Sequence, residues 1–154
     1  MRYSCTLTID RPRDAVVTLF DDQANLPKWQ KGLVSFPHIG GEEGKEGAVS
    51  RIEYKMGKRE ITMTETIVRR EFPDAFTGIY EADGVWSRVD NRFEVIDNHT
   101  THWWVESEFR CKGFLRLMAW LMPGMFSKQT MSFMQDFKSF VEDELPPSAD
   151  RQQG

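Results

Sequence analysis

The first residues of the chain alternate between apolar and polar positions. Tyr3, Cys5, Leu7 and Ile9 are apolar, whereas the residues between them are polar. A period of two is typical of a β-strand with one buried face. We therefore predict a first strand over residues 2–9 that lies against a core.

The pattern becomes helical directly after this strand. Asp10 is a candidate N-cap and Pro12 suits a first helical turn, because its missing N–H costs nothing there. Apolar residues at helical spacing follow over residues 16–20. A second short helix is predicted next, with Asn25 as its cap and Trp29 as its apolar anchor.

Strand alternation returns after the glycine-rich loop at residues 40–44 and continues to Cys111. Short turns separate the alternating segments, and Asp83-Gly84 is a strong hairpin signal among them. Consecutive hairpins of this kind predict an antiparallel meander. The predicted inward positions include Tyr54, Met56, Met63, Glu65, Tyr80, Ser87, Asn91, Trp103 and Ser107.

Helical spacing takes over from Gly113 onward. Pro123-Gly124 predicts a break, and a long helix is expected from about residue 123 to residue 144. Residues 146–154 are polar and are predicted to form a flexible tail. Without repeats or linkers, residues 1–145 are predicted to form one α+β domain.

A long antiparallel sheet with one buried face needs a cover, and the terminal helix is the longest candidate. A straight helix cannot fill the concave side of a twisted sheet, so the remaining space is predicted to be a pocket. Methionines suit such a pocket because they adapt their shape, although they equally suit a filled core. The predicted apolar boundary comprises Tyr54, Met63, Tyr80, Trp103, Met122 and Phe126, with Met56, Met118 and Met125 nearby.

Several polar residues share the inward parity. Burying such a group without a partner costs about 1–3 kcal/mol or more, so each needs a protein partner, water or a ligand. Glu65 is the best single candidate for an orienting or acid–base residue, with a pKa raised by desolvation. The alternative is a bulge that turns Glu65 to solvent. For Asn91 the alternative is a structural hydrogen bond.

Composition narrows the function classes. The formal charge is −4 and there is no basic run, which predicts neither nucleic-acid binding nor a polybasic membrane anchor. We see no signal-peptide pattern, so a cytoplasmic location is expected. Two distant cysteines and three scattered histidines predict no metal site, and we expect no cofactor.

Residues 9–16, with Pro12 before a helix, and residues 25–29, with Trp29 in a short helix, resemble a signature of the START/Bet v 1-like (SRPBCC) superfamily. Glu65-Thr66-Ile67-Val68, Phe72-Pro73 and Gly113 before the last helix fit the same resemblance. It covers residues 2–144. It implies a helix-grip fold, in which a curved antiparallel sheet of six to seven strands wraps around a long C-terminal helix, with two short helices after the first strand.

The superfamily includes polyketide cyclases and lipid-transfer domains, but it has no shared catalytic residue to carry over. Its fold places the first strand antiparallel to the last. The resemblance therefore implies that Cys5 and Cys111 are close neighbours, and a reducing compartment predicts that both remain thiols.

Three functions remain open. The first is binding or carriage of a small hydrophobic molecule, lipid-like or polyketide-like, by Tyr54, Met56, Met63, Glu65, Tyr80, Ser87, Asn91, Trp103, Met118, Met122 and Phe126. The second is a cyclase/aromatase-like or dehydratase-like enzyme without a metal. Glu65, Tyr54, Tyr80 and Asn91 are its acid–base candidates, with Arg88 or Arg110 at the pocket mouth; His102 has the outward parity and is a poor base.

The third function is a protein-interaction or chaperone-cofactor module. Trp86 and Trp104 would be its exposed anchors, unless Arg88 and Arg110 shield them. The expected partner is a small hydrophobic ligand, with no nucleic acid and no stable membrane insertion. The expected oligomeric state is a monomer or a weak homodimer.

Overall fold

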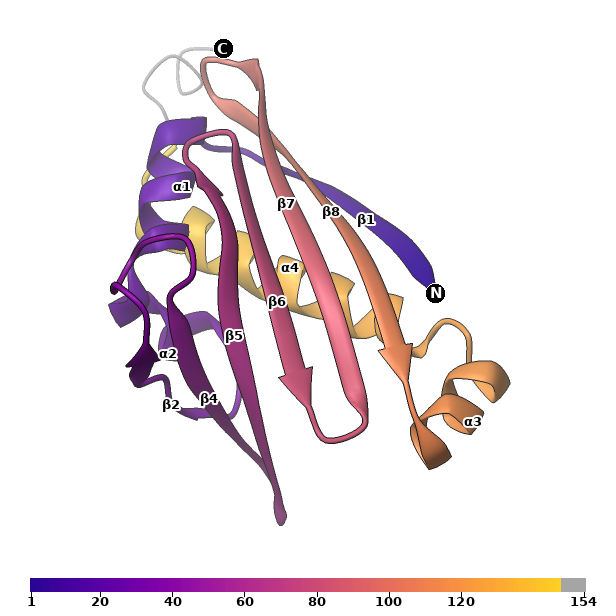
Figure 1. Cartoon of the computed structure of the whole chain (residues 1–154). Helices are drawn as coiled ribbons and strands as arrows, with labels where there is room; N and C mark the ends of the chain where they lie inside the picture. Colours follow the sequence, from indigo (N-terminus) through magenta and orange to yellow (C-terminus); the bar gives the residue numbers. More distant parts are fainter. Residues whose placement is uncertain (148–154) are drawn as a thin grey trace.

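The computed structural model describes residues 1–147 of the chain (Figure 1). The strands are β1 (Arg2–Ile9), β2 (Leu33–Ser35), β3 (His38–Gly40), β4 (Val49–Met56), β5 (Arg59–Glu71), β6 (Ala75–Ala82), β7 (Val85–Asp97) and β8 (Thr100–Cys111). The helices are α1 (Arg13–Asp21), α2 (Leu26–Trp29), α3 (Gly113–Leu121) and α4 (Met125–Glu144), with a 3₁₀ turn η1 (Gln23–Asn25).

All strand pairs are antiparallel, and the sheet follows the order β1-β8-β7-β6-β5-β4-β2, with β3 also paired to β4. Helix α4 crosses one face of the curved sheet (Figure 1). The predicted α+β class and the long covering helix are confirmed. Within residues 1–147 the sheet has eight strands rather than six or seven, because β2 and β3 are only three residues long and too short to produce an alternating pattern.

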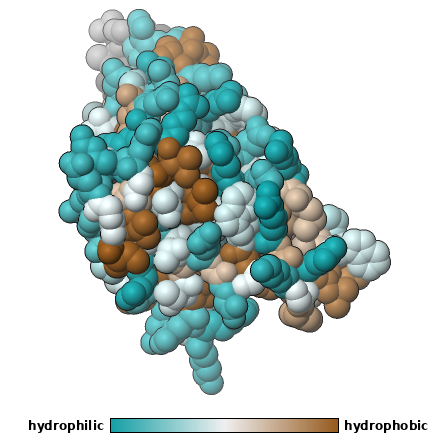
Figure 2. Space-filling view, viewed as in Figure 1, coloured by the Kyte–Doolittle hydropathy of each residue, from teal (hydrophilic) through white to brown (hydrophobic). Residues whose placement is uncertain are grey.

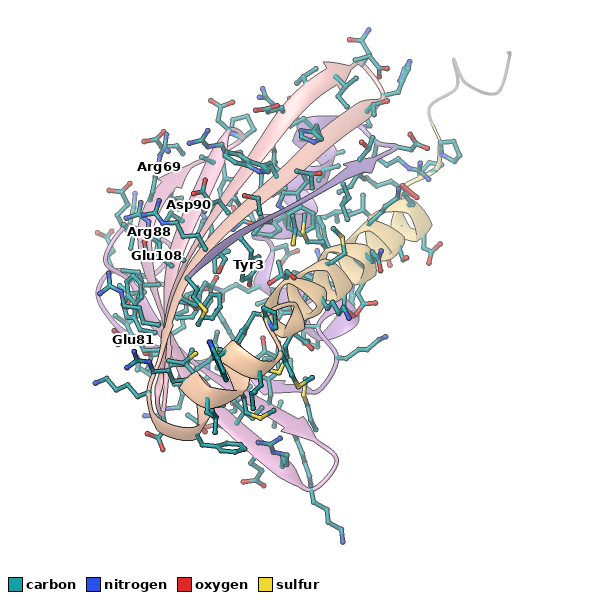
Figure 3. All side chains as sticks on the ribbon, turned by 90° about the vertical axis from the view of Figure 1, so that its right-hand side faces the viewer. Tyr3, Arg69, Glu81, Arg88, Asp90 and Glu108 are labelled. Atoms are coloured by element: carbon teal, nitrogen blue, oxygen red, sulfur yellow. The ribbon has the colours of Figure 1, made fainter. Side chains whose placement is uncertain are left out.

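The two faces of the sheet have different chemistry, as the period-two pattern predicted. Tyr3 points from β1 toward α4, where its hydroxyl lies 2.6 Å from the Thr130 Oγ1. Figure 3 shows Glu81, Arg88 and the other labelled charged side chains on the opposite face. The face toward α4 is therefore the inner one.

The inner face is densely packed toward the β7–β8 hairpin. The Phe20 ring of α1 lies at the centre of this packing, with the rings of Trp29, Phe72, Phe76, Phe93, Trp103 and Phe137 within 6.4 Å of its centroid. Phe137 belongs to α4 and is fully buried. Aromatic packing of α1, α2 and α4 against β7 and β8 thus closes this end, which we call the packed end.

The predicted N-cap of the first helix is wrong. Helix α1 begins at Arg13 after Pro12, and no side chain caps it. The Arg11 guanidinium is buried instead and donates hydrogen bonds to the Leu145 and Glu142 carbonyl oxygens at 2.8 and 2.7 Å. Because Arg11 ties the end of β1 to the end of α4, the chain is still extended where the prediction placed the first turn.

The other predicted helix boundaries agree better with the structure. Asn25 does precede α2, but its side-chain amide donates to the Leu19 carbonyl oxygen rather than capping α2. The predicted break falls between α3 and α4, and α4 ends at Glu144 as expected. Most of the predicted tail, residues 148–154, lies outside the described residues.

The predicted proximity of the two cysteines is also wrong. Strand β1 does lie beside β8, but Cys5 is opposite Val105, six residues before Cys111. At ~3.3 Å per residue that separation is about 20 Å. The pairing of β1 starts with Arg2 opposite Glu108, so β1 does not reach Cys111. Both cysteines are free thiols.

Candidate functional site

A row of polar side chains crosses the inner face of the sheet. Ser50 on β4 lies opposite Glu65 on β5, Glu65 lies opposite Tyr80 on β6, and Tyr80 lies opposite Ser87 on β7. We call these four residues the polar row. The neighbouring rows are apolar: Ile52, Met63, Ala82 and Val85 on one side, and Ile67, Gly78 and Val89 on the other.

Glu65 faces inward because the β5 bulge lies beyond it. The register between β5 and β6 shifts between Ile67 and Arg69, so the sheet is regular at Glu65. The alternative in which a bulge turns this carboxylate to solvent is therefore wrong. Ser50 was not singled out from the sequence, although it lies two residues before Ile52 and shares the inward parity of that alternating segment.

Burial sets the electrostatics of the polar row. Desolvation raises the pKa of Glu65, and a hydrogen bond with the Tyr80 side chain offsets part of that rise. The same burial, followed by the negative charge of Glu65, raises the pKa of Tyr80 well above its ordinary value. Tyr80 is therefore a neutral phenol at physiological pH, and Glu65 holds a proton more tightly than an exposed carboxylate does.

Tyr54 extends the site toward α2. Its hydroxyl donates a hydrogen bond to the side-chain oxygen of Gln30, the residue directly after α2. Burial and, secondly, the charge of Glu65 raise the pKa of Tyr54 to about 12. Two phenols and one carboxyl group therefore influence one another within a small region of the inner face.

The region around the polar row is less tightly covered than the packed end. In the described chain, α4 makes its main contacts with β1 and α2 rather than with β4, β5 or β6. Half-buried side chains here include Tyr54, Met63, Glu65, Tyr80, Ser87, Met118 and Phe126. Side chains on a covered face keep exposed area only where the cover is incomplete, so we call this region the open end.

Met56 and Met122 lie at the rim of the open end. Their exposed fractions are 43% and 50%, so neither is enclosed. Beside Met122, a groove of about 510 Å³ lies along the segment that joins α3 to α4 and the start of α4. It is lined by Met122, Pro123, Gly124, Met125, Lys128 and Gln129.

Asn91 and Trp103 belong to the packed end instead. The Trp103 indole N–H donates to the Asn91 side-chain oxygen at 3.1 Å, and the Asn91 amide donates to the Phe76 carbonyl oxygen at 3.4 Å. Both side chains are buried. The structure therefore supports the alternative in which Asn91 makes a structural hydrogen bond.

Comparison with known proteins identifies the fold. No protein-family model matches the chain, and no curated protein does. Among solved structures, it superimposes on the ZhuI aromatase/cyclase from Streptomyces sp. R1128 with a TM-score of 0.79 at 13% identity, covering 97% of this chain and 98% of that one. The chain has the START/Bet v 1-like helix-grip fold.

Other structures with this fold carry different descriptions. A START superfamily protein from Mycobacterium smegmatis matches with a TM-score of 0.76 at 9% identity, covering 94% of this chain and 99% of that one. Norcoclaurine synthase from Thalictrum flavum, in complex with dopamine and hydroxybenzaldehyde, matches with a TM-score of 0.69 at 12% identity, covering 95% and 88%. The fold is thus shared by proteins of unlike function.

The prediction that Arg88 or Arg110 lies at the pocket mouth is wrong, because both residues lie on the outer face of the sheet. Arg88 pairs with Asp90 and Arg110 pairs with Glu108, all on the outer face. Arg88 directly follows Ser87 of the polar row, and Arg110 follows Phe109, which lies opposite Ser87. Because side chains alternate along a strand, both arginines point to the other face of the sheet. His102 also faces outward, as predicted, with its ring nitrogen 3.5 Å from the Glu94 carboxylate.

The exposed-tryptophan interpretation also fails on this outer face. The Arg110 guanidinium lies 4.6 Å from the Trp86 ring centroid, and the Arg92 guanidinium lies 4.8 Å from that of Trp104. Both indoles are partly buried. Shielding by arginine was the expected alternative, but Arg92 takes the place predicted for Arg88.

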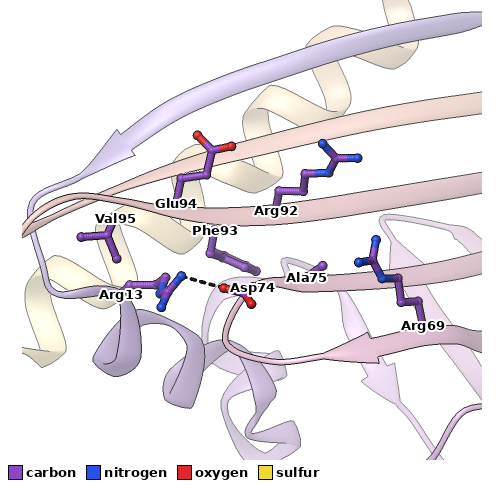
Figure 4. A pocket seen from close by; sticks show the side chains of 8 residues that line it. All are labelled: Arg13, Arg69, Asp74, Ala75, Arg92, Phe93, Glu94 and Val95. Carbon is purple, nitrogen blue, oxygen red and sulfur yellow. Dashed lines mark hydrogen bonds and ion pairs between the residues drawn. The ribbon is translucent and has the colours of Figure 1, made fainter.

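A second hollow, of about 370 Å³, opens near the start of α1 (Figure 4). Arg13 donates to Asp74 at 2.7 Å there, Arg69 pairs with Glu71, and Arg92 is stacked over Trp104. Because these guanidinium groups already interact with protein side chains, the hollow gives weaker grounds for a ligand site than the polar row. Among residues 1–147, no cluster of His, Cys, Asp and Glu side chains could hold a metal ion.

Proposed function

We propose that the protein binds a small hydrophobic molecule at the open end, with the polar group of that molecule directed at the polar row. The observation that carries this proposal is a line of four polar side chains on an otherwise apolar face, of which Ser50 is buried and Glu65, Tyr80 and Ser87 are half-buried. Apolar surroundings with a few convergent polar groups are typical of small-molecule sites. The helix-grip fold, shared with proteins described as START and aromatase/cyclase, is consistent with it.

The chemistry of the polar row defines what such a ligand would carry. The Tyr80 phenol is a donor, and Glu65 accepts a hydrogen bond when ionised and donates one when protonated. A carbonyl or hydroxyl group on an apolar skeleton satisfies both, which fits polyketide-like and lipid-like molecules. The indole N–H of Trp29 is also buried without a hydrogen-bond partner in the described residues, but its ring packs against Phe20 and Phe137 in the packed end.

Native mass spectrometry of freshly purified protein tests this proposal first, by detecting a co-purified apolar molecule. Displacement of a fluorescent apolar probe then measures affinity. Glu65→Gln and Tyr80→Phe should each weaken binding of a carbonyl-bearing ligand by roughly tenfold, since each alters one hydrogen bond of about 1–1.5 kcal/mol. Glu81→Gln is the matched control, because Glu81 follows Tyr80 on β6 but points outward. Equal affinities in all four proteins contradict the proposal.

A second candidate is a cyclase-like enzyme, favoured by the raised pKa of Glu65 beside a neutral phenol. In such a reaction the Glu65 carboxylate would take a proton from the carbon next to a ketone, while Tyr80 donates a hydrogen bond to the developing enolate oxygen. Exchange of that proton for deuterium, followed by NMR on a bound β-keto compound, is the test. Exchange that Glu65→Gln abolishes without loss of binding supports an enzyme. A ligand that binds without any exchange supports a carrier.

A further inference from the structure

Helix α3 is apolar on both of its sides. Ala119 is buried where α3 meets β8. On the opposite side Phe114, Leu117, Trp120 and Leu121 recur at helical spacing and form one stripe, with exposed fractions of 72%, 50%, 76% and 58%. We call this stripe the outer face of α3. In Figure 2 it belongs to the brown and pale projection at the lower right, where Figure 1 places α3.

The sequence around this stripe is rich in basic residues. Residues 109–135 contain four basic residues and no acidic one, although the whole chain has a net charge of −4. Lys112 directly precedes α3, Arg116 lies within it, and Lys128 lines the adjacent groove; all three are exposed. One acidic residue, Asp83, adjoins the start of α3, where the Lys112 backbone N–H donates to the Gly84 carbonyl oxygen. The basic residues of α3 and its flanks outnumber it, so this part of an acidic chain has a local excess of positive charge.

We propose that the outer face of α3 docks the protein reversibly on the surface of a membrane that contains anionic lipid. Bulky apolar side chains beside lysine and arginine are the pattern of helices that lie in the membrane interface. No helix among residues 1–147 is long and apolar enough to cross a membrane, and α3 has only nine residues. Docking is therefore superficial, with Phe114, Leu117 and Trp120 entering the headgroup region.

Charge distinguishes this partner from a second copy of the chain. In a symmetric dimer through α3, two faces that both carry Lys112 and Arg116 would be apposed, and like charges repel. An anionic surface is instead complementary to them. The same face is followed directly by Met122 and the groove at the start of α4. Docking would therefore bring the open end of the site to the membrane, where apolar molecules are dissolved.

Vesicle flotation tests the proposal with the full chain. Phosphatidylcholine vesicles are compared with vesicles containing about 30% phosphatidylglycerol, at low and at high salt. Binding is expected only with the anionic lipid and should weaken as salt rises. Leu117→Glu should reduce it more than tenfold. Ile96→Glu is the matched control, since Ile96 is 55% exposed on β7, which ends at the opposite end of the sheet.

Charge variants test the electrostatic part separately, without touching the apolar stripe. Lys112→Gln and Arg116→Gln should each weaken binding to anionic vesicles by roughly fivefold. Circular dichroism confirms that every variant is folded. The proposal is overturned if wild-type protein ignores anionic vesicles, if Leu117→Glu binds as well as wild type, or if Ile96→Glu loses binding equally. A dimer in sedimentation that Leu117→Glu dissociates, without vesicle binding, assigns the face to self-association instead.

The docking proposal goes beyond the proposed ligand function, and the two can fail independently. Probe binding in vesicle-free solution depends on the polar row and should be unchanged in Leu117→Glu. Loss of flotation with intact probe binding therefore reports on α3 alone. Intact flotation without any ligand uptake would contradict only the ligand proposal.

Discussion

The Tyr80 ring lies directly over Gly78, two residues before it on the same strand. A Cβ atom added to Gly78 would be 2.9 Å from the Tyr80 hydroxyl oxygen and 3.0 Å from two of its ring carbons. Contacts this short are not tolerated, so only glycine permits this orientation of the ring. Gly78 thereby directs the phenol of the polar row along the sheet instead of across the space below α4.

Gly78→Ala should therefore displace the Tyr80 side chain. We expect a loss of about 1–3 kcal/mol in the free energy of unfolding from the overpacked methyl group, and weaker probe binding. In a Tyr80→Leu background the same substitution should cost much less, because the clashing ring is gone. Urea unfolding of the four proteins measures this coupling. Gly40→Ala is the control, because its Cβ would be at an ordinary 3.7 Å from Val49; a similar loss there would refute the specific role of Gly78.

The strand pattern explains why so much of the sheet was predictable. Inward and outward parity is a property of each strand alone, and the inward parity of Glu65, Tyr80 and Ser87 holds in the structure. Their alignment in one row is different, because it depends on register between strands. Hairpin turns determine register only locally. Ser50 joins the row through the pairing of β4 with β5, so the sequence pattern alone did not single it out.

The packing against the sheet was harder to predict for a similar reason. Trp103 and Tyr80 have the same inward parity, yet Trp103 lies among aromatic rings in the packed end and Tyr80 lies in the open end. Which part of the sheet a helix covers depends on tertiary contacts between α1, α4 and the strands. Those contacts join residues more than a hundred positions apart, such as Phe20 and Phe137.

Glu65 should make stability depend on pH in a defined direction. Its pKa is raised in the folded state, mainly by desolvation. The native protein therefore keeps this proton while the unfolded chain ionises, and stability falls as pH rises from 4.5, the ordinary pKa, to the raised value. Below 4.5 both states are protonated and the penalty is absent.

Urea unfolding of wild type and Glu65→Gln between pH 4 and pH 8 measures this effect. The variant should gain stability relative to wild type as pH rises, because glutamine cannot ionise. Other carboxyl groups, such as those of Glu71 and Glu108, titrate in both proteins and cancel in the difference. A stability difference that is constant across this range would mean that Glu65 is not desolvated.

Titration of Tyr54 and Tyr80 tests the burial of the same group of residues around Glu65. Tyr54 should ionise near pH 12, and the pKa of Tyr80 should lie well above its ordinary value, because burial and the charge of Glu65 oppose both phenolates. In Glu65→Gln the pKa of Tyr54 should fall but stay above 10, since burial is the larger cause. NMR of ¹³Cζ-labelled tyrosine, assigned with Tyr54→Phe and Tyr80→Phe, follows each ring. Ionisation of Tyr54 near pH 10 in wild type would contradict the enclosed position of its hydroxyl.

The two cysteines provide a chemical test of the strand register. Cys5 is 6% exposed and its thiol lies 3.5 Å from the Ser127 carbonyl oxygen, whereas Cys111 is half-buried at the end of β8. Burial raises the pKa of both thiols, with the N-terminal charge partly offsetting the rise at Cys111. Both should therefore react more slowly with Ellman's reagent than an exposed thiol, and Cys111 should react before Cys5.

Oxidation then distinguishes the observed register from the one in which these cysteines are neighbours. A disulfide requires Cα atoms roughly 4.4–6.8 Å apart, and the observed pairing separates Cys5 from Cys111 by about 20 Å along the sheet. Diamide treatment of the native monomer should yield no intramolecular disulfide by mass spectrometry, whereas the urea-unfolded chain, in which the two thiols can meet, should form one. Cys111→Ser controls for mixed products. Rapid formation of an internal disulfide in the native monomer would require β1 to pair with β8 in a register shifted by about six residues, which would also move Tyr3 away from Thr130.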